Sequence, residues 1–289
     1  MSHSPVGRSS ELTPSERQFL KEAAEFLEHP GAFIRTANLL GQPIEMVQKR
    51  LPDKVRHAIE AATHGALKRA LKVALLTIPD EIRSGKPLLP AGQKGESSNR
   101  WHEFGAAITG SLGGFFGLPS LAVELPITTA LMLRSIARNA QACGADLNSP
   151  ETQLECLYVF TLSAKTPHDA AETSYYASRL GLGKLVSEAA AFIAKHSARE
   201  AFDMLERGTV PVLVKLMSRI AAQFEITVSE KFLSESIPII GAAGGAVVNA
   251  AFTHHFNQAA KFHFGIRQLE ERYGQAKVRS AYTALLRRV

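Results

Sequence analysis

The chain has 289 residues, of which 45% are hydrophobic and 21% charged, a balance typical of a folded protein and unlike that of a disordered chain or a polytopic transporter. Its 33 basic and 27 acidic residues give a net charge of +6, and the excess lies at the two ends: residues 1–100 carry 15 basic and 11 acidic groups, and residues 201–289 carry 11 and 7. Cys143 and Cys156 form no CxxC pair, which argues against a disulfide framework or a zinc ribbon and favours a reducing compartment.

The first structural signal lies near the N-terminus. Residues 1–12 lack the apolar segment of a secretory signal, and we expect them to form a flexible tail on a protein made in the cytosol. Thr13 then offers a hydroxyl N-cap, Pro14 stands at the first helical position and Glu16 at the third. This capping pattern predicts a helix that begins at Pro14 and runs to about Glu28.

A longer amphipathic helix is predicted between residues 55 and 78. Small or apolar residues recur there every three to four positions, whereas most basic residues fall on other faces. The apolar positions are Ile59, Ala62, Ala66, Ala70, Ala74 and Ile78. Residues 84–100, which follow, are rich in Gly, Pro and Ser, so we expect a mobile loop there.

An apolar block covers residues 104–133, where Glu124 is the only charged residue in 30. Its length would suffice to cross a bilayer. Small residues recur there at intervals of four and form a stripe against which another helix could pack closely. The stripe consists of Ala106, Gly110 and Gly114 in one row and Gly113 and Gly117 in another. Because Pro119 and Pro126 interrupt the block, we predict two short apolar helices joined by a turn, each too short to span a membrane alone.

Helical periodicity returns beyond this block. Ser149 followed by Pro150 predicts a helix start, and Thr166 followed by Pro167 predicts another. Helical patterns continue over residues 185–198, 210–224 and 252–286. Strand-like alternation is scarce, and only residues 224–228 could form a short extended segment.

A second block, residues 236–260, carries no charge. Gly241 and Gly245 lie in a new small-residue stripe, whereas the polar residues from Asn249 onward disfavour contact with lipid tails. Three arrangements are open: the two blocks pack against each other inside one soluble domain, they insert into a membrane, or they enclose a cavity for a hydrophobic ligand. In each case the predicted fold is all-α, a single multi-helix domain with two Gly-rich apolar central helical segments.

Several motifs follow one another in a distinctive order along the chain. They are the Gly-rich stretch 105–117, Glu124-Leu125-Pro126, the arginine-bearing segment 131–137, Gly144-Ala145-Asp146, Ser149-Pro150-Glu151, Ile237-Pro238, the segment 241–245, Asn249, Arg267 and residues 269–274. In this order the sequence resembles the EcsC family of bacterial proteins over about residues 50–275, with Glu124 where that family more often has Asp. The resemblance implies a helical domain over residues 13–289. It implies no mechanism, because the family, named for a protein encoded beside a bacterial ABC transporter, has no established activity.

Two short motifs approach catalytic patterns without completing them. Thr109 to Gly113 is close to the GxSxG nucleophile elbow around Ser111, but Thr109 replaces the first Gly and no strand precedes it. Gly181 to Lys184 lacks the other residues of a phosphate-binding P-loop and is interpreted as the end or a kink of a helix. No catalytic residue is therefore assigned.

Histidines form the remaining candidate clusters. His57, Glu60 and His64 share a helical face, but no ExxH pair accompanies them, so we interpret them as a solvated surface and predict neither a metal site nor a cofactor. His255 and His263 also share a face and are interpreted as buried polarity, with a pH-responsive role as the alternative. The basic residues form no recognised nucleic-acid-binding module.

Glu124 is the strongest candidate for a functional side chain, because a carboxylate in an apolar block is costly unless it is paired, protonated or exposed to water. Its position between Pro119 and Pro126 favours a capping role at a turn or a helix start. The alternative is that Glu124 lines a ligand or lipid-headgroup pocket together with Asn249 or Arg134.

These observations lead to one functional hypothesis and two alternatives. We expect a non-enzymatic protein, peripheral to or partly embedded in the cytoplasmic membrane, that binds membrane lipid or another hydrophobic ligand in an accessory role in transport or envelope processes. Membrane proteins are further candidate partners, and nucleic acid is not. The alternatives are a soluble hydrolase or lipid-modifying enzyme with a hydrophobic cavity, and a soluble protein–protein adaptor. The candidate ligand-binding or core-packing residues are Gly110, Gly114, Gly117, Pro119, Glu124, Pro126, Arg134, Gly241, Gly245 and Asn249.

Overall fold

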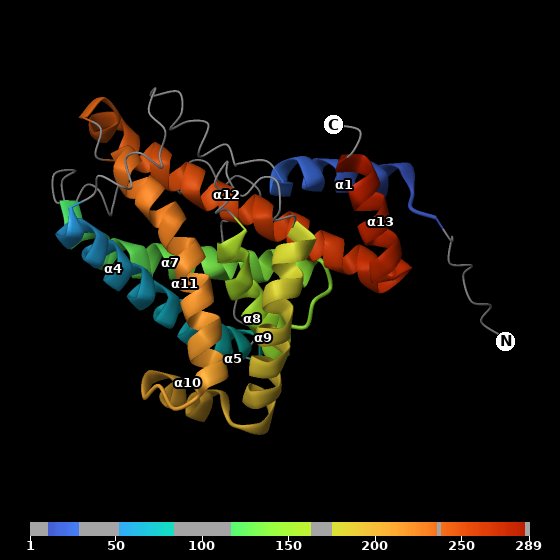
Figure 1. Ribbon diagram of the computed structural model, residues 1–289, viewed down its shortest axis with the longest axis horizontal. Helices are drawn as coiled ribbons and strands as arrows, with labels where there is room; N and C mark the ends of the chain where they lie inside the picture. Colours follow the sequence, from blue (N-terminus) through green and yellow to red (C-terminus); the bar gives the residue numbers. More distant parts are fainter. Residues whose placement is uncertain (1–10, 29–51, 84–116, 163–174, 236–237, 287–289) are drawn as a thin grey trace.

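All regular secondary structure that the computed structural model describes is helical (Figure 1). The structure describes residues 11–28, 52–83, 117–162, 175–235 and 238–286, and of residues 83, 117–120, 233–235 and 238–248 it describes only the backbone. No strand occurs in these ranges, and the helices form one domain, which confirms the predicted all-α fold.

The helices differ widely in length. In chain order they are α1 (Pro14–Glu28), α4 (Asp53–Lys72), α5 (Ile78–Arg83), α7 (Gly117–Ala142), α8 (Pro150–Tyr158), α9 (Tyr175–Lys195), α10 (Ala198–Glu206), α11 (Pro211–Glu235), α12 (Pro238–Tyr273) and α13 (Gln275–Leu286). The π-helical turn η1 (Val73–Thr77) joins α4 to α5, and the 3₁₀ turn η2 (Val159–Thr161) follows α8. Gly208 (φ 69°) and Gly274 (φ 88°) end α10 and α12 in the left-handed conformation that glycine adopts without strain.

The start of α1 follows the capping pattern of the sequence. The backbone N–H of Glu16 donates to Thr13 Oγ1 (3.2 Å), and the Glu16 carboxylate accepts the backbone N–H of Thr13 (2.8 Å). These reciprocal bonds satisfy two N–H groups that helix geometry leaves without partners. The predicted bounds of this helix, Pro14 to Glu28, are confirmed. Leu12, at the end of the predicted tail, is buried beside α1.

The amphipathic pattern between residues 55 and 78 is also confirmed. Its helix runs through α4, η1 and the start of α5, and all six apolar positions of the pattern are at most 6% exposed. The basic residues Lys68, Arg69 and Lys72 lie on the exposed side. The period of the sequence therefore identified the inward face of this helix correctly.

Gly65 offers a test of helix propensity in α4. The residue is exposed, and a Cβ added to it would meet no atom within 4 Å. Because alanine loses less backbone entropy than glycine in a helix, we expect Gly65→Ala to raise the free energy of unfolding by about 1 kcal/mol. Chemical denaturation followed by circular dichroism measures the change. Gly265→Ala provides the contrast, since its added Cβ would overlap the Phe19 ring and should lower stability. An unchanged or lower value for Gly65→Ala would contradict the expectation.

The structure corrects the prediction for the first apolar block. We predicted two short helices separated by a turn between Pro119 and Pro126, but α7 is one helix that contains both prolines. Pro119 lies in the first turn, where no intrahelical N–H bond is lost. Pro126 has no N–H, so the carbonyl of Ala122 loses its helical hydrogen bond. Ala122 is an exposed residue, so water can take the place of the missing donor. Burial of the inner face of α7, including Leu125, outweighs this loss.

Smaller predictions also need correction, and others lie outside the described residues. Residues 224–228 are part of α11 and are not extended. Gly181 to Lys184 lie inside α9 and do not end it, so of the two predicted roles only a kink stays a prediction. The predicted loop at 84–100 and the predicted start at Thr166 fall outside the described ranges.

The longest helix, α12, organises the domain. Helices α7 and α11 pack along it, α4 packs against both α7 and α11, and α1 and α13 pack against its C-terminal part (Figure 1). Helix α9 packs against α11, and α8 and α10 pack against α9. Most of the second Gly-rich block lies in α12, and α12 contacts the helix that holds the end of the first block.

Two hydrophobic clusters hold these helices together. The larger cluster joins α4, α7, α8, α9, α11 and the middle of α12, and a smaller one joins α1 and α13 to the ends of α9 and α12. At the centre of the larger cluster the rings of Phe160, Phe224 and Phe256 pack in tilted and edge-to-face arrangements at centroid separations of 4.9 to 5.7 Å. Such aromatic contacts fix how η2, α11 and α12 cross.

Candidate functional site

Glu124 lies in a polar cluster at the crossing of three helices. Its carboxylate, on α7, accepts hydrogen bonds from Lys231 Nζ on α11 (3.1 Å) and from Asn249 Nδ2 on α12 (2.8 Å). The Lys231 side chain is 1% exposed and the Glu124 side chain 14%. Lys231 Nζ also lies 5.7 Å from the centroid of the Phe252 ring. A buried cation is thus held by a carboxylate and an aromatic face.

This geometry excludes one of the two interpretations of Glu124. The capping interpretation is wrong, because Glu124 lies inside α7 and not at a turn or a helix start. The contact with Asn249 that we considered as the alternative is present, and the contact with Arg134 is not. Arg134 instead pairs with Glu81 of α5 (3.1 Å). Lys231 was missed, since it lies among charged residues of ordinary spacing and nothing in its neighbourhood signals burial.

The remaining predicted site residues lie near this cluster in sequence but add no described side-chain contact. Pro126 is half-buried and lies two residues after Glu124, and Gly117 and Pro119 lie in the first turn of α7. Gly241 and Gly245 lie near the start of α12. Gly110 and Gly114 are outside the described residues.

The cluster therefore ties α7, α11 and α12 together. Asn249 Oδ1 is buried and accepts no hydrogen bond from the described part of the chain, but neither of the clefts described below reaches it. With its carboxylate directed at a lysine and an amide, Glu124 offers no exposed nucleophile or base.

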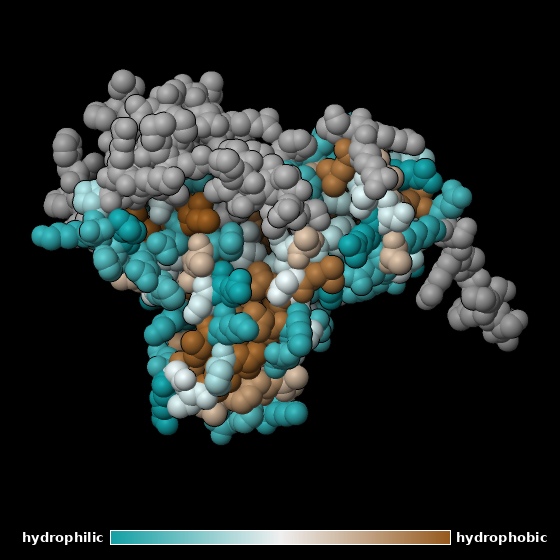
Figure 2. Space-filling view, in the orientation of Figure 1, coloured by the Kyte–Doolittle hydropathy of each residue, from teal (hydrophilic) through white to brown (hydrophobic). Residues whose placement is uncertain are grey.

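A cleft of about 660 Å³ lies elsewhere, between α9 and α11, and not between the two Gly-rich blocks, where a cavity was one of the arrangements considered from the sequence. Its volume is within the range of small-molecule sites in proteins. Apolar groups make up much of its wall: Leu27, Leu162, Tyr175, Gly181, Leu182, Leu185 and Ala222. Figure 2 shows hydrophobic surface between α11 and α9, bordered on both sides by hydrophilic residues.

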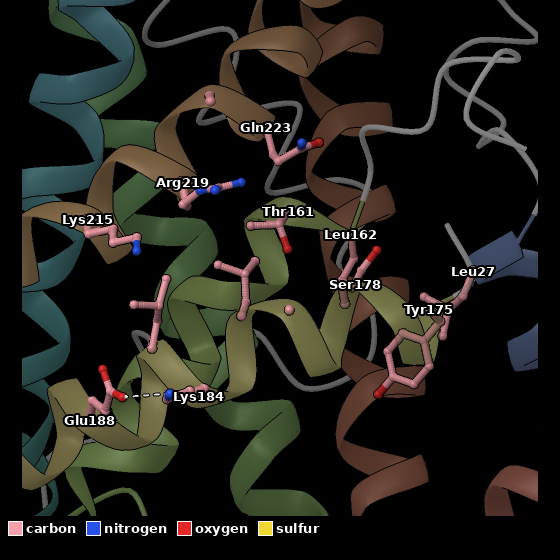
Figure 3. A pocket seen from close by; sticks show the side chains of 14 residues that line it. Leu27, Thr161, Leu162, Tyr175, Ser178, Lys184, Glu188, Lys215, Arg219 and Gln223 are labelled. Carbon is pink, nitrogen blue, oxygen red and sulfur yellow. Dashed lines mark ion pairs between the residues drawn. The ribbon is translucent and has the colours of Figure 1, made fainter. Parts of the chain in front are cut away.

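Positive side chains line the α11 side of this cleft. Lys215, Arg219 and Gln223 are spaced by four residues, so they share one helical face, and all three project from α11 on the same side to line the cleft (Figure 3). Lys215 and Arg219 form no ion pair with any described residue. On α9, Lys184 lies 3.8 Å from Glu188, and both side chains are largely exposed. The cleft thus combines an apolar wall with a net positive rim.

The end of α1 closes one side of the cleft. Leu27 lines it, and the neighbouring Glu28 carboxylate accepts the backbone N–H of Tyr175 (2.7 Å) and the hydroxyl of Tyr282 (3.0 Å). The first bond caps the N-terminus of α9 with a negative charge. Helix α1 is therefore fixed to both α9 and α13 beside the cleft.

The histidines have the exposure that was predicted from the sequence. His57, Glu60 and His64 are exposed, and within the described ranges no group of three or more potential ligands could hold a metal ion. His255 and His263 are buried in α12. Burial lowers the pKa of His255 to about 4 and the pKa of His263 well below its ordinary value, so both rings are neutral near pH 7.

No helix in the described residues is both long and apolar enough to span a membrane. The near-elbow around Ser111 lies outside those residues. The segment Gly181 to Lys184 is helical throughout, so it lacks the loop that cradles phosphate in a P-loop.

Fold and cleft together define a class: an all-helical protein with a ligand-sized, apolar cleft whose rim is basic. The family model of the EcsC protein family matches residues 18–269, and the chain belongs to that family. The match extends further toward the N-terminus than the resemblance over residues 50–275 and takes in most of α1. No significant similarity to a curated protein or to a solved structure was found.

Proposed function

We propose that this protein binds an amphiphilic anion, a fatty acid or the acyl chain and headgroup of an anionic lipid, in the cleft between α9 and α11. It does so without catalysing a reaction, at the cytoplasmic face of a membrane. The observation that carries the proposal is the combination of an apolar wall with two cationic side chains, Lys215 and Arg219, that no described carboxylate neutralises.

The physical chemistry of the cleft supports this ligand class. An acyl chain gains from leaving water for the wall formed by Leu182, Leu185 and Ala222, at roughly 0.8 kcal/mol per buried methylene. A carboxylate or phosphate at the end of that chain can remain at the rim, where a guanidinium and an ammonium favour negative charge. A neutral hydrocarbon would leave these two charges unused, and a small hydrophilic anion would leave the apolar wall uncovered.

The charge of the whole chain supports a membrane setting. The net charge of +6 attracts the protein to the anionic surface of a cytoplasmic leaflet, and this attraction weakens as salt screens it. Among the described helices, exposed basic residues of α4 and α11 provide such surfaces. A peripheral protein of this kind could take its ligand directly from the bilayer.

Vesicle sedimentation with a charge variant tests the proposal. We expect the wild-type protein to bind vesicles that contain phosphatidylglycerol and not vesicles of phosphatidylcholine alone. Replacing Lys215 and Arg219 by Gln should weaken binding about 30-fold at low salt, since each basic residue near the surface contributes about 1 kcal/mol. Lys195→Gln/Arg199→Gln is the matched control, because it removes the same charges from exposed positions away from the cleft.

A second variant separates the cleft from the general surface. Gly181→Phe would place a ring in the cleft without changing charge, because a Cβ at Gly181 meets no atom within 4 Å. We expect this variant to lose the binding of a fluorescent fatty acid. Normal fatty-acid binding by Gly181→Phe, or equal loss of vesicle binding in both charge variants, would contradict a ligand site in this cleft. Absence of lipid binding together with a stably co-purifying protein would favour the adaptor alternative.

A further inference from the structure

A second cleft, of about 320 Å³, lies on the other side of α9, where α8, α12 and α13 meet it. We propose that this cleft binds a small oxyanion, a phosphate or carboxylate group, through hydrogen-bond donors that the fold leaves without partners. The site is separate from the cleft between α9 and α11, and the proposal does not depend on the proposed lipid ligand.

Two buried polar atoms in this cleft have no hydrogen-bond partner in the described part of the chain. They are the hydroxyl of Tyr158 and Nε2 of His263. Tyr158 is 3% exposed and His263 is 1% exposed. The two rings lie side by side, with centroids 5.3 Å apart, and both line the cleft. Folded proteins rarely leave such atoms unsatisfied, because each loses its bonds to water on burial. A ligand in the cleft would supply the missing partner.

The neighbours of His263 determine what its Nε2 can do. The Tyr175 hydroxyl lies 2.8 Å from His263 Nδ1. Burial raises the pKa of Tyr175 and lowers that of His263, with Arg179 and Arg267 lowering the latter further, so the hydroxyl keeps its proton and the ring is neutral. When Tyr175 donates to Nδ1, the single ring proton lies on Nε2. Nε2 then offers an N–H donor to the cleft.

Three arginines surround these donors. Arg179 is held by Glu270 through two bonds (2.9 and 2.6 Å), and Glu270 also accepts the hydroxyl of Tyr176 (3.0 Å). Arg267 makes one ion pair, with Glu155 (3.1 Å), which leaves other N–H groups of its guanidinium without a described partner. Arg279 makes no described ion pair.

The arrangement of Arg279 completes the site. Its guanidinium lies 5.7 Å from the centroid of the Tyr176 ring at the exposed side of the cleft. More basic than acidic residues line the cleft. The basic residues are Arg179, Lys184, Arg267 and Arg279, and the acidic residues are Glu151 and Glu155. The unused groups are thus a hydroxyl, a ring N–H and guanidinium N–H groups, all of which can donate. A ligand that satisfies them must accept several hydrogen bonds, and an oxyanion does so with a charge that the arginines favour.

Isothermal titration calorimetry of the full chain, with inorganic phosphate and separately with acetate, tests the proposal. We expect at least one of the two anions to bind with a Kd below about 1 mM. Tyr158→Phe should weaken that binding by at least about tenfold, because one hydrogen bond to a charged group is lost. The same variant should unfold at an unchanged or higher temperature without anion, since the deleted hydroxyl has no described partner. Tyr273→Phe, which removes a hydroxyl bonded to Glu16 away from the cleft, is the matched control.

Two further measurements make the result specific to this cleft. Arg279→Gln removes an exposed charge and should weaken binding without loss of stability. In ¹⁵N spectra, the Nε2 resonance of His263 should shift when the anion is added. Binding of phosphate alone or of acetate alone would identify the group, and both outcomes support the site. Failure of both anions to bind, or wild-type affinity in Tyr158→Phe and Arg279→Gln, would overturn it.

Discussion

Replacing Glu124 by Leu should lower the free energy of unfolding by about 3 kcal/mol, because the variant removes a carboxylate that pairs with a buried ammonium. Lys231 is almost fully inaccessible and lies 3.1 Å from Glu124. Asn249 would lose the acceptor of its amide N–H at the same time. The loss should appear in urea denaturation as a lower midpoint with an unchanged slope.

A double-mutant cycle would show that the pair, and not the packing of Glu124 alone, carries this effect. Lys231→Met removes the buried charge, so the double variant Glu124→Leu/Lys231→Met should be more stable than the Glu124→Leu single variant. The exposed pair of Arg56 and Asp53 is the control: Arg56→Gln should change stability by no more than about 0.5 kcal/mol. The prediction would be contradicted if Glu124→Leu lowered the free energy of unfolding by as little as Arg56→Gln does.

The Glu124 cluster also shows how far sequence reasoning could identify a site. Glu124 was identifiable because it is the only charge in a block of 30 residues, and Asn249 because it follows a second uncharged block. Lys231 was not, since Glu230 and Glu235 surround it with the charge density of an ordinary surface. Its burial results from the crossing of α11 with α7 and α12, which no local pattern encodes.

The helices themselves were predictable where the signals are local. Capping at Thr13 and the period of α4 depend on neighbours within a turn or two, and both predictions are confirmed. At Pro126 the local rule failed, because a proline's lost hydrogen bond is weighed against the burial of Leu121 and Leu125 on the same helix. The burial of these leucines is the larger contribution, and it depends on the packing of α4 and α12 against α7.

The two clefts were beyond prediction for a related reason. Lys215, Arg219 and Gln223 follow the spacing of any solvated helical face, and Gly181 and Gly183 resemble a helix end. Whether such a face meets bulk water or a neighbouring helix depends on the position of α9 relative to α11. The glycines, which need no special conformation here, leave open space beside α9 on both of its sides.

Acid should destabilise the fold through His255, and the direction follows from its pKa. The ring stacks on Phe26 of α1 at a centroid separation of 5.1 Å, and burial lowers its pKa from 6.5 to about 4. Above pH 6.5 the ring is neutral in both the folded and the unfolded chain and has no effect on pH dependence. Between pH 6.5 and pH 4 the unfolded chain binds a proton that the folded chain does not, so stability falls as pH falls.

The loss amounts to about 3 kcal/mol once pH 4 is reached, at 1.36 kcal/mol per unit of pKa difference. His255→Phe keeps an aromatic ring against Phe26 and removes the titrating group. The free energy of unfolding of this variant, relative to the wild type, should therefore rise by about that amount as pH is lowered. Removal of the exposed histidine in His57→Gln should produce no such trend. Parallel pH profiles for His255→Phe and the wild type would show instead that the buried ring titrates normally, which requires α1 to move away from α12 in acid before the fold is lost.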